Sequence, residues 1–319
     1  MEYRRVGRSG LRVSAVSVGG WLTLGASVDH DASAEILEAA VEGGVNFIDL
    51  ADIYAFGAAE SAAGRFLERY CATPGNQRSD LVISSKAFWP MSDDPNDQGL
   101  SRKHLFESVD KSLRRLHTDY LDIYFCHRFD PDTPLAETAR AMNDLVAKGK
   151  VLYWGTSVWT AAQLTEVTDL CERRGWVLPI VEQPRYNLVD RSIEDEVLPA
   201  VRDLGMGLVC WSPLAQGLLT GKYDGGVPEG SRGSTTQWLD NTLTEANLAR
   251  VRELTAIAAD LGVEVGSLAL AWLLRRPGIT SVITGATRPE QVRANLSAAT
   301  IELDDEVVAR IGRLFAREI

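Results

Sequence analysis

The chain has 319 residues, of which 45% are hydrophobic and 24% charged, with 27 glycines and 12 prolines. This balance is typical of a soluble globular protein and excludes a disordered chain, and the length suits a single barrel domain over residues 1–319. The formal net charge of -11 predicts a surface that repels nucleic acid and anionic membranes. Neither is therefore expected as a partner, and an anionic ligand would need a local group of cations.

Nothing in the sequence indicates a targeting segment or a membrane span. The N-terminal segment MEYRRVGRSGLRVSAV carries basic side chains but lacks the apolar region of a signal peptide. No stretch reaches the ~18 apolar residues of a membrane-spanning helix, so we expect a cytoplasmic protein without membrane insertion. The cysteines follow no CxxC spacing, and we expect buried free thiols at Cys71, Cys126, Cys171 and Cys210.

In chain order, two short segments around Gly7 to Gly10 predict a hairpin, and apolar runs then alternate with amphipathic stretches. The predicted strands are 14–18, 45–49, 81–85, 121–126, 151–155, 179–183, 207–211 and 280–284. The clearest predicted helices between them are 33–44, 103–116, 135–149 and 161–175. Parallel strands need helical crossovers, so eight such repeats predict a (β/α)8 barrel. An open doubly wound sheet is the alternative, although no G-x-G-x-x-G motif occurs.

Two further segments depart from this alternation. Residues 222–244, KYDGGVPEGSRGSTTQWLDNTLT, are rich in Gly, Ser and Thr and follow the seventh predicted strand. A connection of that length predicts a lid or a ligand-binding loop. The last amphipathic stretch, 304–318, has no strand after it, and we expect an extra helix on the outside of the barrel.

The residues expected at the carboxyl ends of the strands suggest an active site. Asp49, Tyr54, Lys86 and His127 lie at or just past the ends of successive apolar runs, and in a (β/α)8 barrel these ends meet at one face. Tyr54 would be the proton donor, with its pKa lowered from ~10 by the Lys86 ammonium. Asp49 would hold Lys86 charged, and His127 would hydrogen-bond the oxygen that receives the proton.

Each of these residues alone has a common structural explanation, such as a helix cap, a packed aromatic ring or a satisfied core histidine. Their joint occurrence on one expected face favours the catalytic interpretation. A metal-dependent hydrolase is not expected, because His30, His104, His117 and His127 are scattered and no HxH or HExxH motif occurs.

These residues lie within stretches that resemble the aldo-keto reductase family, and most closely its branch of voltage-gated potassium-channel beta subunits and their bacterial relatives. The stretches include NFIDLADIYAFGAAE, VISSKAFW, YWGTSVW, VEQPRYN, WSPLAQGLLTGKYDGG and GATRPEQVRANL. The resemblance implies a catalytic tetrad of Asp49, Tyr54, Lys86 and His127. His127 stands where the channel beta subunits tend to carry Asn, which favours a working reductase. The chain departs from the family pattern at Leu50, Val158 and Ala294.

The resemblance also implies where NADPH or NADP binds. Ser157 and Gln183 match residues that hold the nicotinamide carboxamide, and Trp211 matches the aromatic residue that stacks on the ring. The residues that match the pyrophosphate-clasping loop are Ser212, Leu214, Gln216, Lys222, Ser231 and Arg232. Those that match the adenosine phosphate site are Gly285, Thr287, Arg288, Gln291 and Asn295. The predicted cofactor-binding set is completed by Gly20, Trp21, Asp49 and Pro213.

The function expected from this pattern is NADPH-dependent reduction of aldehydes and ketones to alcohols. Trp21, Phe56, Trp89 and His127 would line an apolar and aromatic pocket for a small-molecule carbonyl substrate. The alternative is a regulatory subunit of a membrane protein that binds the cofactor with little turnover. The chain begins at the predicted hairpin, so an N-terminal inactivation peptide is not expected. The resemblance further implies a homo-oligomer, most simply a tetramer.

Overall fold

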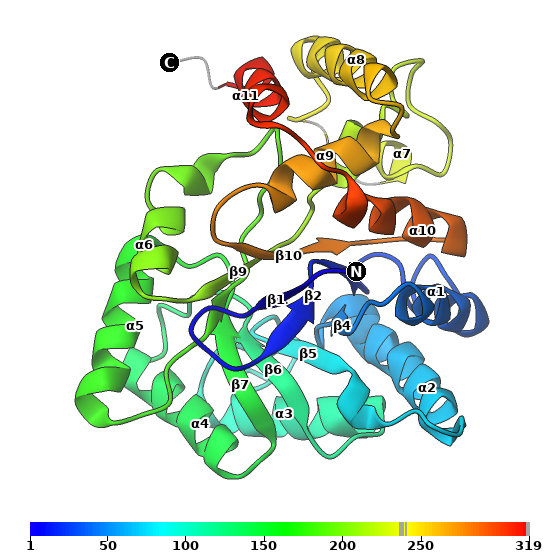
Figure 1. Ribbon diagram of the computed structural model, residues 1–319. Coiled ribbons are helices and arrows are strands. Elements are labelled where there is room, and N and C mark those ends of the chain that lie inside the picture. The colour runs from blue at the N-terminus through cyan, green and yellow to red at the C-terminus, as the bar shows by residue number, and fades with distance from the viewer. Residues whose placement is uncertain (236–238, 240, 317–319) are drawn as a thin grey trace.

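The computed structural model describes residues 1–235, 239 and 241–316, and its centre is a closed barrel of parallel strands (Figure 1). The strands neighbour one another in the order β10-β3-β4-β5-β6-β7-β8-β9, which confirms the predicted barrel and excludes the open sheet. Their bounds are β3 Val16–Gly19, β4 Phe47–Asp49, β5 Val82–Ala87, β6 Leu121–Cys126, β7 Val151–Thr156, β8 Val181–Glu182, β9 Gly207–Cys210 and β10 Ile279–Thr284.

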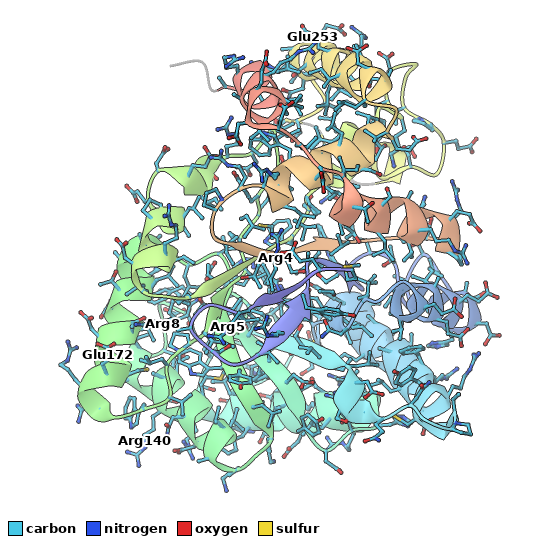
Figure 2. The ribbon with its side chains drawn as sticks, in the orientation of Figure 1. Arg4, Arg5, Arg8, Arg140, Glu172 and Glu253 are labelled. Atoms are coloured by element: carbon cyan, nitrogen blue, oxygen red, sulfur yellow. The ribbon has the colours of Figure 1, made fainter. Side chains whose placement is uncertain are left out.

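Helices surround the barrel on the outside, as Figure 1 shows. Their bounds are α1 His30–Glu42, α2 Ala58–Ala72, α3 Arg102–Leu116, α4 Leu135–Ala147, α5 Ala161–Arg174, α6 Val197–Asp203, α8 Glu245–Asp260, α9 Val265–Leu274, α10 Pro289–Ser297 and α11 Asp305–Leu314. Figure 2 shows charged side chains that project from this layer into solvent, such as Arg140 on α4 and Glu172 on α5. The apolar faces pack inward against the strands, as expected for amphipathic crossover helices.

The predicted hairpin is formed by β1 (Tyr3–Arg5) and β2 (Arg12–Ser14), which pair antiparallel. Val6 and Val13 are fully buried and pack with barrel residues such as Phe47 and Val209, so the hairpin closes the amino-terminal mouth of the barrel. Gly7 makes this approach possible, because a Cβ there would lie 2.4 Å from the Gly205 carbonyl oxygen.

The segment after β9 is the long connection that the sequence predicts. It begins with a 3-10 turn, η4 (Ala215–Thr220), and contains the short helix α7 (Arg232–Thr235). Residues 236–238 and 240 lie outside the described part of the chain. The predicted extra helix is α11, which packs on the outside where the Trp272 indole N–H donates to the Val308 carbonyl at 3.0 Å. Residues 317 and 318 of that prediction also lie outside the description.

The cysteine prediction is only partly right. Cys126, Cys171 and Cys210 are buried free thiols, whereas Cys71, in the last turn of α2, is exposed. No single helix among the described residues is long and apolar enough to cross a membrane. Helices α8 and α9 reach that length only as a pair, and they meet at 90°.

Candidate active site

The predicted tetrad comes together at the carboxyl ends of three neighbouring strands. Asp49 is the last residue of β4, Lys86 lies in β5, and His127 follows β6. Tyr54 lies in a 3-10 turn, η1 (Tyr54–Gly57), directly after β4. Lys86 is the last but one residue of β5. Its side chain is therefore buried inside the barrel and is not exposed at the end of the strand.

An ion pair between Lys86 and Asp49 forms the base of the site. The Lys86 ammonium lies 2.7 Å from Asp49 Oδ2, and the two side chains are 0% and 3% exposed. Lys86 also donates to the Leu50 carbonyl at 2.7 Å. Asp49 Oδ1 accepts hydrogen bonds from the Ser84 hydroxyl at 2.8 Å and the Gln183 amide at 2.9 Å. A buried ion pair is tolerated when its remaining donors and acceptors are satisfied in this way.

Tyr54 contacts the ion pair through Lys86. The Lys86 ammonium lies 3.2 Å from the Tyr54 hydroxyl and 4.8 Å from the centre of its ring. Burial, followed by the Asp49 carboxylate, raises the pKa of Tyr54 well above its usual value of 10.0. The predicted lowering by Lys86 is therefore wrong in sign, because the loss of solvent and the nearby carboxylate outweigh the ammonium. Tyr54 is a protonated phenol across neutral pH.

His127 lies against Tyr54, with the two ring centres 5.9 Å apart at an interplanar angle of 77°. Burial lowers the pKa of His127 well below 6.5, and Lys86 and Arg128 lower it further. The imidazole is therefore neutral, and a neutral imidazole keeps one N–H donor. Its Nδ1 is buried and has no hydrogen-bond partner within the described part of the chain.

The pair predicted to hold a carboxamide lies next to this centre. Ser157 follows β7 and donates to the Gln183 carbonyl at 2.8 Å, while the Gln183 amide reaches back to Asp49. Glu182, the last residue of β8, directly precedes Gln183 but was not predicted as a site residue. It accepts hydrogen bonds from Thr156 and the Trp159 backbone, and burial raises its pKa to about 7. The signal that could have revealed it is a carboxylate inside the apolar run PIVEQ.

Strained backbone gathers at this same end of the barrel. Left-handed φ values occur in non-glycine residues after β3, β4, β7 and β9, namely Leu22, Ala55, Phe56, Val158, Ser212, Ala215 and Gln216. Such conformations are costly for residues with a Cβ, above all for a β-branched residue such as Val158, and they cluster at functional sites. The sequence alone did not predict this strain.

The residues predicted to clasp the cofactor surround β9 and the turn that follows it. Trp211 is half-buried and packs edge to face with Trp21, with 5.8 Å between ring centres. The Gln216 amide donates to the Ser212 hydroxyl at 3.1 Å. Pro213 is buried, Leu214 and Ser231 are half-buried, Gly20 is buried, and Lys222 is exposed. Arg232 is the first residue of α7, and its side chain is not among those that the structure describes.

The predicted adenosine phosphate site lies at the start of α10. Thr287 donates to the Gln291 side chain from its backbone N–H at 2.8 Å and from its hydroxyl at 3.1 Å. Arg288 is the exposed N-cap of this helix, with Glu290 3.8 Å away. Gly285 is exposed and Asn295 is buried. A cation at a helix start opposes the helix dipole, and a bound phosphate would relieve that conflict.

The predicted pocket residues differ in burial. Trp21 is half-buried, and Trp89 is 37% exposed with its ring 6.3 Å from His127. Phe56 is 73% exposed in the strained turn η1, so its ring stands at the rim of the face. Arg128 was not predicted, yet its guanidinium lies 5.5 Å from the centre of the Trp89 ring.

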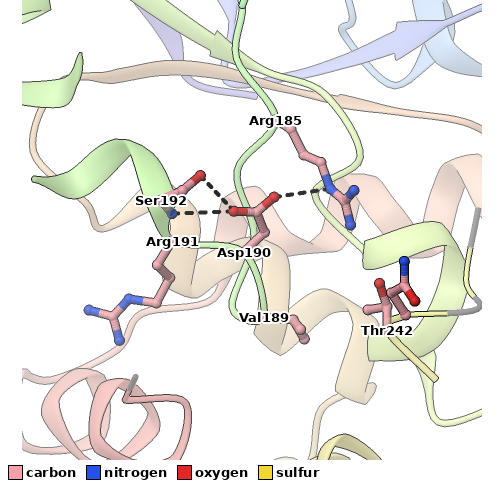
Figure 3. Close-up of a pocket in the computed structure, with 7 residues that line it drawn as sticks. Arg185, Val189, Asp190, Arg191, Ser192 and Thr242 are labelled. Atoms are coloured by element: carbon pink, nitrogen blue, oxygen red, sulfur yellow. Dashed lines mark hydrogen bonds and ion pairs between the residues drawn. The ribbon is translucent and has the colours of Figure 1, made fainter. Parts of the chain in front are cut away.

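A separate cavity of about 430 Å³ opens beside Trp211, lined by Arg185, Val189, Asp190, Arg191, Ser192, Asn241 and Thr242 (Figure 3). Arg185 lies 3.3 Å from Asp190 and 6.0 Å from the centre of the Trp211 ring. The cavity therefore lies between residues 185–192 and the end of the long loop, and one of its lining residues, Arg185, lies near Trp211. Arg185, like Arg128, was not predicted as a residue of this face.

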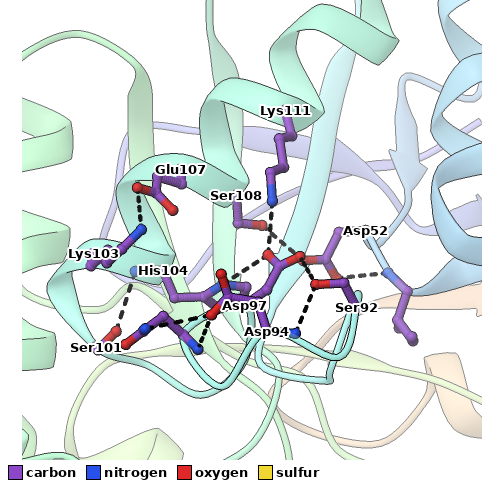
Figure 4. A network of polar contacts seen from close by, with 12 residues as sticks. Asp52, Ser92, Asp94, Asp97, Ser101, Lys103, His104, Glu107, Ser108 and Lys111 are labelled. Atoms are coloured by element: carbon purple, nitrogen blue, oxygen red, sulfur yellow. Dashed lines mark hydrogen bonds and ion pairs between the residues drawn. The ribbon is translucent and has the colours of Figure 1, made fainter.

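A further buried carboxyl, Asp52, lies in the loop between Asp49 and Tyr54. Asp52 accepts hydrogen bonds from the Ser108 hydroxyl at 2.8 Å and the Ile53 backbone at 2.6 Å. Burial, followed by Glu60, raises its pKa to about 7. Figure 4 shows Asp52 beside a second network, in which Lys111 donates to Asp97 at 2.8 Å. Within the described residues, no group of three or more His, Cys, Asp or Glu side chains could hold a metal ion.

Comparison with known proteins agrees with this geometry. Residues 15–315 match the Aldo/keto reductase family. The chain belongs to the aldo/keto reductase family. It is 45% identical over 318 residues to a probable voltage-gated potassium channel subunit beta of Oryza sativa, covering 98% of this chain and 95% of the relative.

Two further relatives of this aldo/keto reductase carry similar names. A probable voltage-gated potassium channel subunit beta of Arabidopsis thaliana is 45% identical over 306 residues, covering 94% of this chain and 92% of its own. A putative voltage-gated potassium channel subunit beta of Schizosaccharomyces pombe is 38% identical over 324 residues, covering 98% and 93%. Membership supports oxidoreduction of carbonyl compounds, and the family generally binds NADP(H).

Proposed function

We propose that this protein reduces aldehydes and ketones to alcohols with NADPH, and that Tyr54 is the proton donor. One observation carries the proposal: the Tyr54 hydroxyl lies 3.2 Å from an ammonium that is itself fully buried and fixed to Asp49. A phenol in this position is protonated before the reaction and has a cation beside it when it becomes a phenolate. That is the requirement for a general acid whose conjugate base must be stabilised.

The residues would act in the following way. Bound NADPH supplies a hydride to the carbonyl carbon. The Tyr54 hydroxyl donates its proton to the carbonyl oxygen, and Lys86 stabilises the phenolate that remains. Neutral His127 orients the same oxygen through an N–H donor, and burial keeps it from taking a second proton. Asp49 keeps Lys86 charged, since burial alone lowers the pKa of Lys86 and the carboxylate opposes that change.

The chain offers groups that suit this cofactor. Trp211 presents a half-buried indole for stacking, and the Ser157 and Gln183 pair lies beside it. Exposed Lys222 and Arg288 supply positive charge for phosphates, and the helix start at Pro289 supplies backbone N–H donors. These residues support extended binding of NADPH across the ends of strands β7 to β10, without a Rossmann motif.

The direct test is the variant Tyr54→Phe. It should lower kcat for a generic aldehyde by ~10²- to 10⁴-fold, because the general acid is lost. NADPH affinity, measured by fluorescence quenching, should be almost unchanged, because the hydroxyl is not needed to hold the cofactor. Wild-type kcat in this variant, under conditions where chemistry limits the rate, would exclude Tyr54 as the donor.

A second candidate function is a regulatory subunit that binds NADPH with little turnover. The names of the relatives favour it, since each is called a potassium channel subunit beta. Steady-state oxidation of NADPH with a panel of aldehydes separates the two functions. Many turnovers per protein support the reductase, and tight NADPH binding without turnover of any aldehyde supports the regulatory subunit.

We also propose that the protein is a cytoplasmic homotetramer, as the relationship to channel beta subunits suggests. Light scattering across micromolar concentrations measures the mass directly. A value near four times 34.9 kDa supports the tetramer, and a value near 34.9 kDa excludes it.

A further inference from the structure

Arg128 differs from several other half-buried arginines of the described chain. Arg78 pairs with Asp122 at 2.7 Å, Arg115 with Glu60 at 2.6 Å, and Arg276 with Glu194 at 3.4 Å. Arg128 has no carboxylate within ion-pair distance among the described residues. Its guanidinium instead donates to the His127 carbonyl at 2.5 Å and lies over the Trp89 ring.

The charge of Arg128 is therefore incompletely balanced. A guanidinium has five N–H donors, and burying a charge without a counter-ion is costly. Burial lowers the pKa of Arg128, and only Tyr54 and Glu182 act in the opposite direction. Glu182 is itself engaged by Thr156 and the Trp159 backbone, and it lies outside ion-pair distance of Arg128.

The position of Arg128 connects it to the reacting centre. It follows His127 directly, its guanidinium covers Trp89, and the Trp89 ring lies 6.3 Å from His127. Arg128 also lowers the pKa of Tyr54 and that of His127, so its charge is felt at both groups that would contact the carbonyl oxygen. A substrate placed between Tyr54 and His127 would therefore extend along the Trp89 side toward this guanidinium.

We propose that Arg128 binds a carboxylate on the substrate, so that the preferred substrates are aldehydes or ketones that carry one acidic group. This inference rests on the proposed reductase function. The planar guanidinium fork suits a carboxylate. Lys86 is already neutralised by Asp49, so the single charge of Arg128 beside it matches a monoanionic carboxylate better than a doubly charged phosphate. A local cation is also needed because the net charge of -11 repels anions.

The test compares two aldehydes of the same shape, 4-carboxybenzaldehyde and its neutral methyl ester, methyl 4-formylbenzoate. The measured quantity is the ratio of kcat/KM for the acid to kcat/KM for the ester. Arg128→Gln should lower this ratio by about 10- to 100-fold, the size expected for one charge-assisted contact. The variant is expected to slow both substrates through its effect on Tyr54, and the ratio cancels that common loss. Arg128→Lys should restore part of the ratio, because it restores the charge without the fork.

The matched control is Arg69→Gln, which removes one positive charge from an exposed ion pair with Glu38 on the outer helices. Its ratio should equal that of the wild type. The proposal is overturned by an unchanged ratio in Arg128→Gln or by the same decrease in Arg69→Gln.

A measurement on the wild type covers the case in which Arg128→Gln does not fold or neither aldehyde is turned over. Benzoate and benzamide are titrated into the NADPH-loaded protein, and binding is followed by tryptophan fluorescence, since Trp89 lies beside Arg128. Benzoate should bind at least tenfold more tightly than benzamide, and equal affinity would overturn the proposal. Absence of turnover with both aldehydes would count against the reductase function, whereas turnover of both with equal efficiency would count only against the role of Arg128.

Discussion

The tetrad and the predicted phosphate site lie on the same face of the barrel, yet their charges are handled in opposite ways. Lys86 is fully buried and held by Asp49 at 2.7 Å. Arg288 is exposed, and Glu290 approaches it only to 3.8 Å. This difference in burial suits the different roles predicted for the two sites. The tetrad needs charges that are already in position before the substrate arrives, whereas the phosphate site needs cations that remain available for a ligand.

The largest effect is expected for the buried cation of the tetrad, Lys86. Lys86→Met should lower the free energy of unfolding by ~3–5 kcal/mol at neutral pH, because Asp49 is left buried without its cation. Urea unfolding of the apoprotein measures this. The control is Lys111→Met, whose partly exposed pair with Asp97 should be worth at most ~1 kcal/mol. Equal midpoints for the two variants would show that the buried pair has no special stabilising role.

The next largest effect is expected for the exposed cation of the predicted phosphate site, Arg288. Arg288→Ala should weaken NADPH binding by roughly 10- to 100-fold and NADH binding hardly at all, since a charge-assisted contact to a phosphate contributes ~1.5–3 kcal/mol. Stability should not change, because the side chain is exposed. Both cofactors are titrated by fluorescence quenching at low, fixed salt. Equal losses for the two cofactors, or a wild type that prefers NADH, contradict the assignment.

Asp52 is a buried carboxyl that is bonded to no cation among the described residues. Its pKa is raised from 3.8 to about 7, so the folded protein holds a proton that the unfolded chain releases. Stability contributed by this group is therefore lost as the pH rises from about 3.8 toward about 7. Asp52→Asn removes this loss, and its stability relative to wild type should increase by roughly 2–3 kcal/mol between pH 5 and pH 8.

The opposite dependence of stability on pH is expected for the neighbouring Asp97. Burial raises its pKa, but hydrogen bonds from Lys111 and Ser92 outweigh burial, so the folded pKa is lowered. Its contribution to stability is present above the unfolded pKa and is lost as the pH falls. Asp97→Asn should therefore destabilise the protein at pH 8. Urea midpoints of Asp52→Asn at pH 5 and pH 8, and of Asp97→Asn at pH 5 and pH 3, each compared with wild type, check the pair. A constant difference between Asp52→Asn and wild type at pH 5 and pH 8 would contradict the role of burial at Asp52.

The smallest expected effect is that of salt. Screening acts on exposed charges and much less on buried ones, with a Debye length of ~10 Å at 0.1 M. Raising the salt concentration tenfold should weaken NADPH binding severalfold through Lys222 and Arg288, and less so in Arg288→Ala. The contribution of the Lys86 and Asp49 pair, measured as the difference between wild type and Lys86→Met, should hardly change.

Much of the fold follows from local sequence patterns. The run 121–126 is β6 to the residue, and the hairpin, the helices and the long segment after the seventh barrel strand occur where they are predicted. The run 179–183 shortens to Val181–Glu182 as β8, because Pro179 and Pro184 flank it and proline has no N–H for strand pairing. Lys86 lies inside β5, and this position buries it.

The barrel and the residue types that the tetrad requires could be predicted from the chain alone, since periodicity and strand ends are local properties. Only the tertiary structure decided which charges lose their solvent. The tertiary structure raised the pKa of Tyr54 where the sequence predicted a lowering, and it buried Asp52 and Glu182. Among the residues that the structure describes, it also left Arg128 without a carboxylate in ion-pair distance. The physical reason is that desolvation and charge balance depend on side chains contributed by strands far apart in the chain, and no single segment contains that information.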